Sequence, residues 1–115
     1  MDPIKGIVQF NQDRRLSTFD AMAEYNMLVE ELQEFLVAAS LQDQHETVDA
    51  LCDMIVLSVG AIYKLGYDPT ATLQETVKEI TSRKGGFNQD TGKWEKDKTQ
   101  DPATLYKAAY ELARR

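Results

Sequence analysis

The sequence predicts an all-α protein, similar to a four-helix bundle, that assembles as a homo-oligomer. Apolar residues recur at the three- and four-residue spacing of helices over most of the 115-residue chain. Capping and stop residues divide this pattern into four segments. Strand patterns are nearly absent, because the run Val8-Gln9-Phe10 is too short to count. No linker or repeat interrupts the chain, so residues 1–115 are expected to form a single domain.

The first two predicted helices are the longest. The first begins at Ser17, whose hydroxyl can cap it with Asp20 as a partner three residues later, and it ends near Ser40. The second follows Asp43 and stops before Gly66, because glycine accepts the left-handed conformation that ends a helix. One face of the first helix carries apolar residues at helical spacing: Met22, Tyr25, Val29, Leu32, Leu36 and Ala39.

Two shorter helices are expected to complete the bundle. Asp68 and Pro69 fit the cap and the first position of a third helix, which the pair Gly85-Gly86 ends. A turn-rich loop follows. Asp101-Pro102 repeats the same signal before a fourth helix over residues 103–115. The apolar face of that helix is expected to dock on a neighbouring subunit and carries Tyr106, Ala109, Tyr110 and Leu112.

Composition excludes several classes of protein. A hydrophobic fraction of 43% and a charged fraction of 28% are typical of a soluble globular protein. No apolar run reaches the roughly 18 residues of a membrane-spanning helix, and the N-terminus lacks the apolar core of a signal peptide. The single cysteine, Cys52, is interpreted as a reduced core residue of a cytoplasmic protein. The net charge of −6 argues against a nucleic-acid partner, although residues 83–98 are locally basic.

Acidic residues gather on the two long helices. Glu30, Glu31 and Glu34 lie close together on the first helix, and Asp49 and Asp53 lie four residues apart on the second. Most acids on a helix simply face solvent. These two groups have the spacing that places their members on one face of each helix.

The surroundings of Asp53 argue that this aspartate is not simply solvated. With Ile55 and Val48 on the expected core face, Asp49 and Asp53 lie about 120° to 160° away on the helix. Residues 54–62 are nevertheless apolar all round, so the helix is expected to be covered on more than one side. The helix offers no Lys or Arg until its last turn. A covered aspartate is costly unless it is paired or bound to a metal.

Two acidic stripes that face each other between antiparallel helices predict a metal site. Carboxylate oxygens suit Mg²⁺, with Mn²⁺ as a substitute, and such a cation leaves room for water and phosphate oxygens. Glu46 lies on the same stripe as Asp49 and Asp53 and is a possible further ligand, although it could instead complete a capping box with Asp43.

Other catalytic sites are disfavoured by the sequence. A di-iron bundle needs Glu-x-x-His pairs, and the only histidine, His45, is preceded at that distance by Gln42. His45 stands at the predicted start of the second helix, away from the buried face expected for Cys52, which disfavours a Ser-His-Asp or Cys-His nucleophile. No glycine-rich phosphate loop is present.

The acidic motifs resemble those of the MazG-like all-α nucleoside triphosphate pyrophosphohydrolases. The resemblance rests on Glu-Glu-x-x-Glu (residues 30–34), an acidic motif on the next helix, and Leu-Gly-Tyr-Asp (residues 65–68), and it covers roughly residues 7–88. The superfamily includes dimeric dUTPases and phosphoribosyl-ATP pyrophosphohydrolases. The resemblance implies Mg²⁺-dependent cleavage of a nucleoside triphosphate to a monophosphate and pyrophosphate, in a dimer or tetramer.

The resemblance also implies roles for individual residues. Glu30, Glu31 and Glu34 match the first motif. The second motif can be aligned in two ways, either as Glu46 and Asp49 or as Asp49 and Asp53, and we favour the second alignment because both aspartates lie deeper in the helix. Glu30 or Glu31 would orient or deprotonate the attacking water.

Phosphate and base contacts are expected outside the acidic motifs. Arg83 and Lys84 are predicted to bind phosphate, because the family often has a basic residue there and the acidic site needs a counter-charge. Phe10 and Asn11 resemble the base-contacting segment of the family, and Trp94 is a second candidate for stacking on the base.

Two further hypotheses stay open at the level of sequence. A non-catalytic helical module that binds a partner or oligomerises would make the acids dispensable. Within the superfamily, a phosphoribosyl-ATP pyrophosphohydrolase or a strict dUTPase would show the same motifs.

Overall fold

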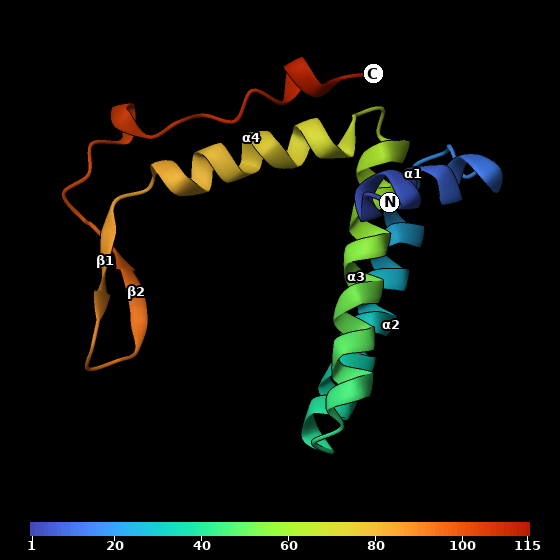
Figure 1. Ribbon diagram of the computed structural model, residues 1–115, viewed down its shortest axis with the longest axis horizontal. Helices are drawn as coiled ribbons and strands as arrows, with labels where there is room; N and C mark the ends of the chain where they lie inside the picture. The colour runs from blue at the N-terminus through green and yellow to red at the C-terminus, as the bar shows by residue number, and fades with distance from the viewer. The chain divides into compact units, whose positions relative to one another are not determined.

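A computed structural model describes residues 1–115 of the protein (Figure 1). The chain forms two compact units, one of Met1–Pro69 with Arg115 and one of Thr70–Arg114. Four α-helices and one two-stranded sheet make up the regular structure, which confirms the all-α class. No helix combines the length and the apolar character that crossing a membrane requires.

The first unit contains a helix that the sequence did not predict. Helix α1 (Pro3–Asp13) is capped by Asp2, whose side chain accepts a hydrogen bond from the Ile4 amide at 2.9 Å. Asp2-Pro3 is the same cap-and-proline signal that marked the later helices, so the signal was present in the sequence. Helix α1 packs against α3.

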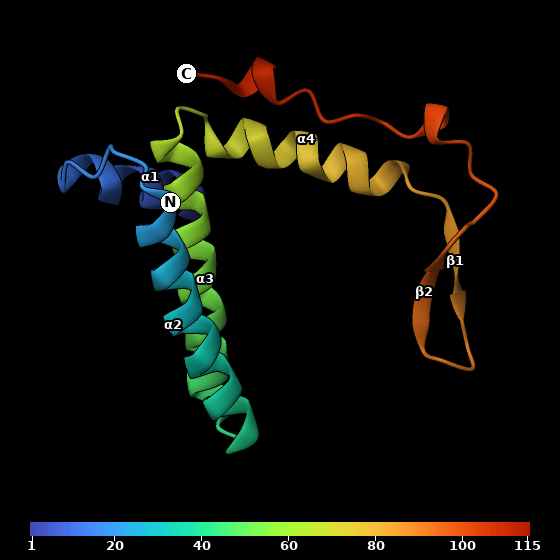
Figure 2. The same ribbon diagram turned by 180° about the vertical axis from the view of Figure 1, so that it is seen from behind.

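Helices α2 (Ala21–Ser40) and α3 (Gln44–Lys64) form an antiparallel pair joined by a short turn (Figures 1 and 2). The cap of α2 is Asp20, which accepts from the amides of Met22 and Ala23, so the predicted start at Ser17 was wrong. Asp20 caps the helix because it directly precedes the first turn, where its side chain reaches the free amides of that turn. The second predicted helix is confirmed, with Asp43 as its cap and Gly66 past its end at φ +97°.

The two long helices leave much of the face that the sequence predicted for the core exposed, although Val59 of that face is buried. Their inner surface is built from small residues, including Ala38, Ala50 and Val59. The stripes expected to form the core are exposed: Leu36 by 65%, Val48 by 57% and Ile55 by 57%. The lone cysteine, expected in the core, is exposed as well. The hydrophobic period was read correctly, but small side chains allow the acid-bearing faces to approach each other instead.

Helix α4 (Pro69–Ser82) belongs to the second unit except for its first residue, and its start agrees with the predicted proline position. The segment expected to be a turn-rich loop is a hairpin of β1 (Gly85–Asn88) and β2 (Lys93–Lys96), with Phe87 opposite Trp94. The turn is closed by Asn88, whose side-chain oxygen accepts from the amides of Asp90 and Thr91. This local hydrogen bonding of asparagine was the turn signal in the sequence.

The fourth predicted helix is wrong. Only two short 3₁₀ turns form, Pro102–Thr104 and Tyr110–Ala113. The remaining chain runs back along α4 (Figure 2), where the Glu75 carboxylate accepts from the Tyr106 hydroxyl at 2.5 Å and from the Ala109 amide at 2.8 Å. Backbone amides bound to α4 cannot donate within a helix, so these tertiary contacts override the helical pattern.

Candidate metal centre

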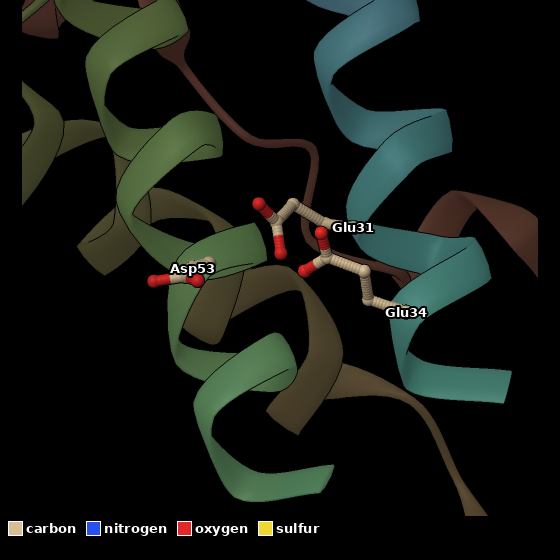
Figure 3. A group of neighbouring side chains, drawn as sticks. All are labelled: Glu31, Glu34 and Asp53. Atoms are coloured by element: carbon tan, nitrogen blue, oxygen red, sulfur yellow. The ribbon is translucent and has the colours of Figure 1, made fainter. Parts of the chain in front are cut away.

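Three carboxylates from the helix pair converge on one point. Glu31 and Glu34 extend from α2 toward α3, where Asp53 lies (Figure 3). Each of the three offers one oxygen atom, and these atoms all lie within 4.8 Å of one another. The spacing of Glu31 and Glu34 along α2 places both on the side that faces Asp53.

Glu31 is the most perturbed member of this cluster. Its Oε2 atom is buried and has no hydrogen-bond partner. Burial first, then a hydrogen bond to Glu34 and the charges of Glu34, Asp53 and Asp49, raise the pKa of Glu31 from 4.5 to about 7. The surroundings of Glu31 therefore disfavour its negative charge and leave one of its oxygens without a hydrogen bond. A cation bound at this point would stabilise the charge and coordinate that oxygen.

The donor set fits a hard divalent cation. All the converging atoms are carboxylate oxygens, and no sulfur or imidazole nitrogen belongs to the cluster. Oxygen donors select Mg²⁺, Ca²⁺ or Mn²⁺ over softer metals. The orphaned oxygen of Glu31 is independent evidence in the same direction.

The other predicted acids lie around this cluster. Asp49 is exposed and close enough to raise the pKa of Glu31. Glu30 and Glu46 line a neighbouring hollow of about 570 Å³, which they share with Glu34. Half of the capping box expected for Glu46 forms, because the Asp43 side chain accepts a hydrogen bond from the Glu46 amide at 3.1 Å. The Asp43 amide donates to the Ala38 carbonyl at 2.9 Å instead of to the Glu46 side chain.

A buried ion pair near one end of the helix pair was missed by sequence reasoning. Glu24 of α2 and Lys64 of α3 are joined at 2.6 Å, with side chains exposed by only 7% and 13%. Lys64 is the one lysine of α3 and is paired with Glu24, so Lys64 does not neutralise the carboxylate cluster. Lys64 was the only cation of that helix in the sequence, which was the available signal.

The candidate base-binding residues of the first unit have structural contacts of their own. Asn11 is buried and its side-chain nitrogen donates to the Ile7 carbonyl at 2.9 Å. A Cβ atom at Gly60 would lie 3.2 Å from that nitrogen, so glycine permits the close approach of α1 to α3. Phe10 is partly exposed beneath the guanidinium of Arg14, which lies 3.9 Å from the ring centre.

The remaining predicted residues belong to the second unit. The Arg83 guanidinium binds both carboxylate oxygens of Glu79, at 3.1 and 2.8 Å. Lys84 and Arg83 line a hollow of about 320 Å³ beside the hairpin, together with Lys96. Trp94 stands half-exposed on β2. Their roles in binding phosphate and base stay predictions.

The fold and the site together define a class: an all-α protein with an interhelical carboxylate cluster suited to a divalent cation. A family model described as phosphoribosyl-ATP pyrophosphohydrolase matches residues 11–79, more than half of the chain. The chain belongs to this family, which is part of the MazG-like superfamily of all-α pyrophosphohydrolases. Searches of curated proteins and of solved structures gave no significant match.

Family membership supports a hydrolase that cleaves a phosphoric anhydride bond of a nucleotide. The match includes all members of the carboxylate cluster and ends before Arg83, Lys84 and Trp94. Phe10 lies just outside its other limit and Asn11 is its first residue.

Proposed function

We propose that the protein is an Mg²⁺-dependent pyrophosphohydrolase that cleaves a ribo- or deoxyribonucleoside triphosphate to its monophosphate and pyrophosphate. The observation that carries this proposal is the convergence of Glu31, Glu34 and Asp53, with the buried and unpartnered oxygen of Glu31 at its centre. A non-catalytic helical module gains no evident stability from such a cluster.

The acidic residues divide into ligands and a base. Glu31, Glu34 and Asp53 would hold the cation, with Asp49 and Glu46 as outer ligands on α3. A bound divalent cation neutralises phosphate oxygens and makes a coordinated water more acidic. Glu30 lines the hollow next to Glu34 without belonging to the cluster. Its carboxylate is therefore the better candidate to orient and deprotonate the attacking water, with Glu31 as the alternative.

The phosphates also need cations from the protein. The helices that carry the cluster offer one cation, Lys64, and it is paired with Glu24. Arg83 and Lys84 remain the proposed phosphate ligands, and binding would require Arg83 to exchange its contact with Glu79. Phe10, Asn11 and Trp94 remain the candidates for the base that the sequence predicts.

We further propose that residues 1–115 act as one functional domain in a cytoplasmic homo-oligomer, either a dimer or a tetramer. The exposed apolar stripes of α2 and α3 support assembly, because a single chain leaves Tyr25, Leu32, Leu36, Val48 and Ile55 largely uncovered. The docking face expected on a fourth helix no longer contributes, since that helix does not form.

Phosphoribosyl-ATP is a second candidate substrate, and the family match favours it. A strict dUTPase is the third member of this group of hypotheses. The three differ in the nucleoside and share the bond that is broken.

A substrate screen tests the proposal. Purified protein is incubated with each common nucleoside triphosphate, each deoxynucleoside triphosphate and phosphoribosyl-ATP, with Mg²⁺ or Mn²⁺, and pyrophosphate and orthophosphate are measured separately. We expect pyrophosphate with at least one substrate and none in excess EDTA. Turnover that persists after verified metal removal, or exclusive release of orthophosphate, would contradict the proposal.

Two variants test the choice of ligands. Asp53→Asn keeps the size of the side chain and removes its charge, so activity should be abolished while circular dichroism stays helical. Glu46→Gln should cost less activity, because Glu46 lies outside the cluster. The opposite ranking would favour Glu46 and Asp49 as the ligand pair of α3.

A further inference from the structure

The end of α3 holds an arginine from a distant part of the sequence. Arg115 belongs to the same compact unit as residues 1–69. Its backbone amide donates to the Gly66 carbonyl at 2.8 Å. Its guanidinium donates to the Tyr63 carbonyl at 2.6 Å and to the Tyr67 carbonyl at 3.3 Å, and it lies 3.9 Å from the centre of the Tyr63 ring. Arg115 is therefore bound through its backbone, through the edge of its guanidinium and through the face of that group.

The acceptors at this point arise from the way α3 ends. The last carbonyls of a helix lack a partner within the helix and form the negative end of its dipole. Gly66 adopts φ +97° just past the last turn, so the chain turns and presents further carbonyls to the same cation. Lys64 lies in that turn, but its ammonium is bound to Glu24 at 2.6 Å. The carbonyls are therefore left for a cation from elsewhere.

The contacts at the end of α3 suit a guanidinium better than an ammonium. A guanidinium is planar, so it can stack on an aromatic ring with its face while its edge donates hydrogen bonds. Both arrangements are present, because Tyr63 supplies the ring and one carbonyl and Tyr67 supplies the second carbonyl. Tyr63 is buried, so packing fixes the position of its ring. The hydrogen-bond acceptors are neutral carbonyls, so recognition depends on the shape of the cation as well as on its charge.

We propose that the end of α3 is a binding site for an arginine residue of a peptide chain, and that Arg115 is its intramolecular ligand. The site takes two groups of one residue, the guanidinium and the backbone N–H. Arg115 keeps the site closed to arginine from other chains, because a ligand within the same chain has a high effective concentration. The site shares no residue with the carboxylate cluster or with the residues proposed to bind phosphate and base, so the inference is independent of the proposed function.

The test empties the site and refills it with a small probe. N-acetyl-arginine amide carries the guanidinium and the backbone N–H, whereas N-acetyl-lysine amide has the same charge and backbone but an ammonium. Each probe is titrated into isotope-labelled protein, and the amide signals of residues 63–67 are followed by NMR. Arg115→Ala should bind the arginine probe saturably in the millimolar range and the lysine probe at least about tenfold more weakly. Wild-type protein should bind neither probe there, because Arg115 occupies the site.

Arg114→Ala is the matched control, because it removes the neighbouring arginine, whose pair with Glu111 is exposed, and leaves Arg115 in place. This variant should bind neither probe, as wild type does. Arg115→Met keeps most of the apolar stem without the charge. It should behave as Arg115→Ala does, and it replaces that variant if circular dichroism shows loss of helix. Absence of saturable shifts in the folded Arg115 variants, equal affinity for the two probes, or equal binding of the arginine probe to wild type would each overturn the proposal.

Discussion

At the scale of single residues, Glu31 lowers the stability of the metal-free protein at the position where the proposed function needs a carboxylate. Glu31 combines a buried oxygen that lacks a partner with a pKa raised to about 7. Nothing in the packing of α2 requires a glutamate at this position, because Ala38 and Ala50 show that small side chains fill the same interface. The sequence could indicate that acids face acids, but not which oxygen would be left unsatisfied.

The first prediction concerns the pH dependence of the metal-free protein. A carboxyl group whose pKa is higher in the folded state holds its proton more tightly there, so its contribution to stability falls as pH rises from 4.5 to about 7. Glu31→Gln removes this effect and should raise the midpoint of thermal unfolding at pH 8 in EDTA, with little change at pH 4. An equal midpoint for the two proteins at pH 8 would contradict the prediction.

The second prediction concerns the buried ion pair. Glu24→Gln leaves the Lys64 ammonium buried without its counter-charge, which should cost about 3 kcal/mol of unfolding free energy in urea titrations. Glu111→Gln is the control, because its pair with Arg114 is exposed and should change stability by less than about 0.5 kcal/mol. Similar losses in both variants would show that burial of the first pair has no energetic consequence.

At the scale of elements, local signals located the helix ends better than the helix faces. Asp43, Gly66 and Pro69 were assigned correctly because capping chemistry depends on neighbouring residues. The helical periodicity identified the apolar stripes of α2 and α3, and we predicted that these stripes form the core. Most of their residues are exposed, because the periodicity of one sequence does not show which face of a helix packs against its partner. The carboxylate cluster was predictable because the acids of the two helices had no nearby Lys or Arg to pair with.

The third prediction concerns the segment that replaces the expected fourth helix. Hydrogen bonds from Lys78, Tyr106 and the Ala109 amide hold the pKa of Glu75 at about 2, below its ordinary 4.5. Its contribution to stability is therefore present above pH 4.5 and is lost as pH falls toward 2. Glu75→Gln should increase amide hydrogen exchange at Tyr106 and Ala109 at pH 7, whereas Glu95→Gln on the exposed hairpin should not. Unchanged protection in Glu75→Gln would contradict the role of this carboxylate.

At the scale of the whole molecule, α2 and α3 expose apolar stripes that a single chain leaves uncovered. Ile55, Leu36 and Met22 expose more than half of their area, and exposed apolar side chains that recur along a helix favour an interaction site. Assembly would also protect the exposed Cys52, which lies on α3 among these residues. The sequence predicted an oligomer through a different element.

The fourth prediction distinguishes the two surfaces that the sequence and the structure offer for assembly. Ile55→Glu places a charge within the exposed stripe of α3 and should shift the protein to monomers in light scattering at micromolar concentration. Leu112→Glu, on the segment first expected to dock, should leave the assembly unchanged although Leu112 is exposed by 82%. Dissociation by Leu112→Glu alone would favour the C-terminal segment as the interface.

The most direct test of the central claim is a Mn²⁺ titration followed by electron paramagnetic resonance, compared between wild type, Asp53→Asn and Asp90→Asn. Asp90 lies in the hairpin turn, so its substitution removes one carboxylate without touching the cluster. We predict saturable binding to the wild type and to Asp90→Asn, with an affinity at least about tenfold weaker in Asp53→Asn. Equal Mn²⁺ affinity in all three proteins would show that Glu31, Glu34 and Asp53 do not form the metal centre.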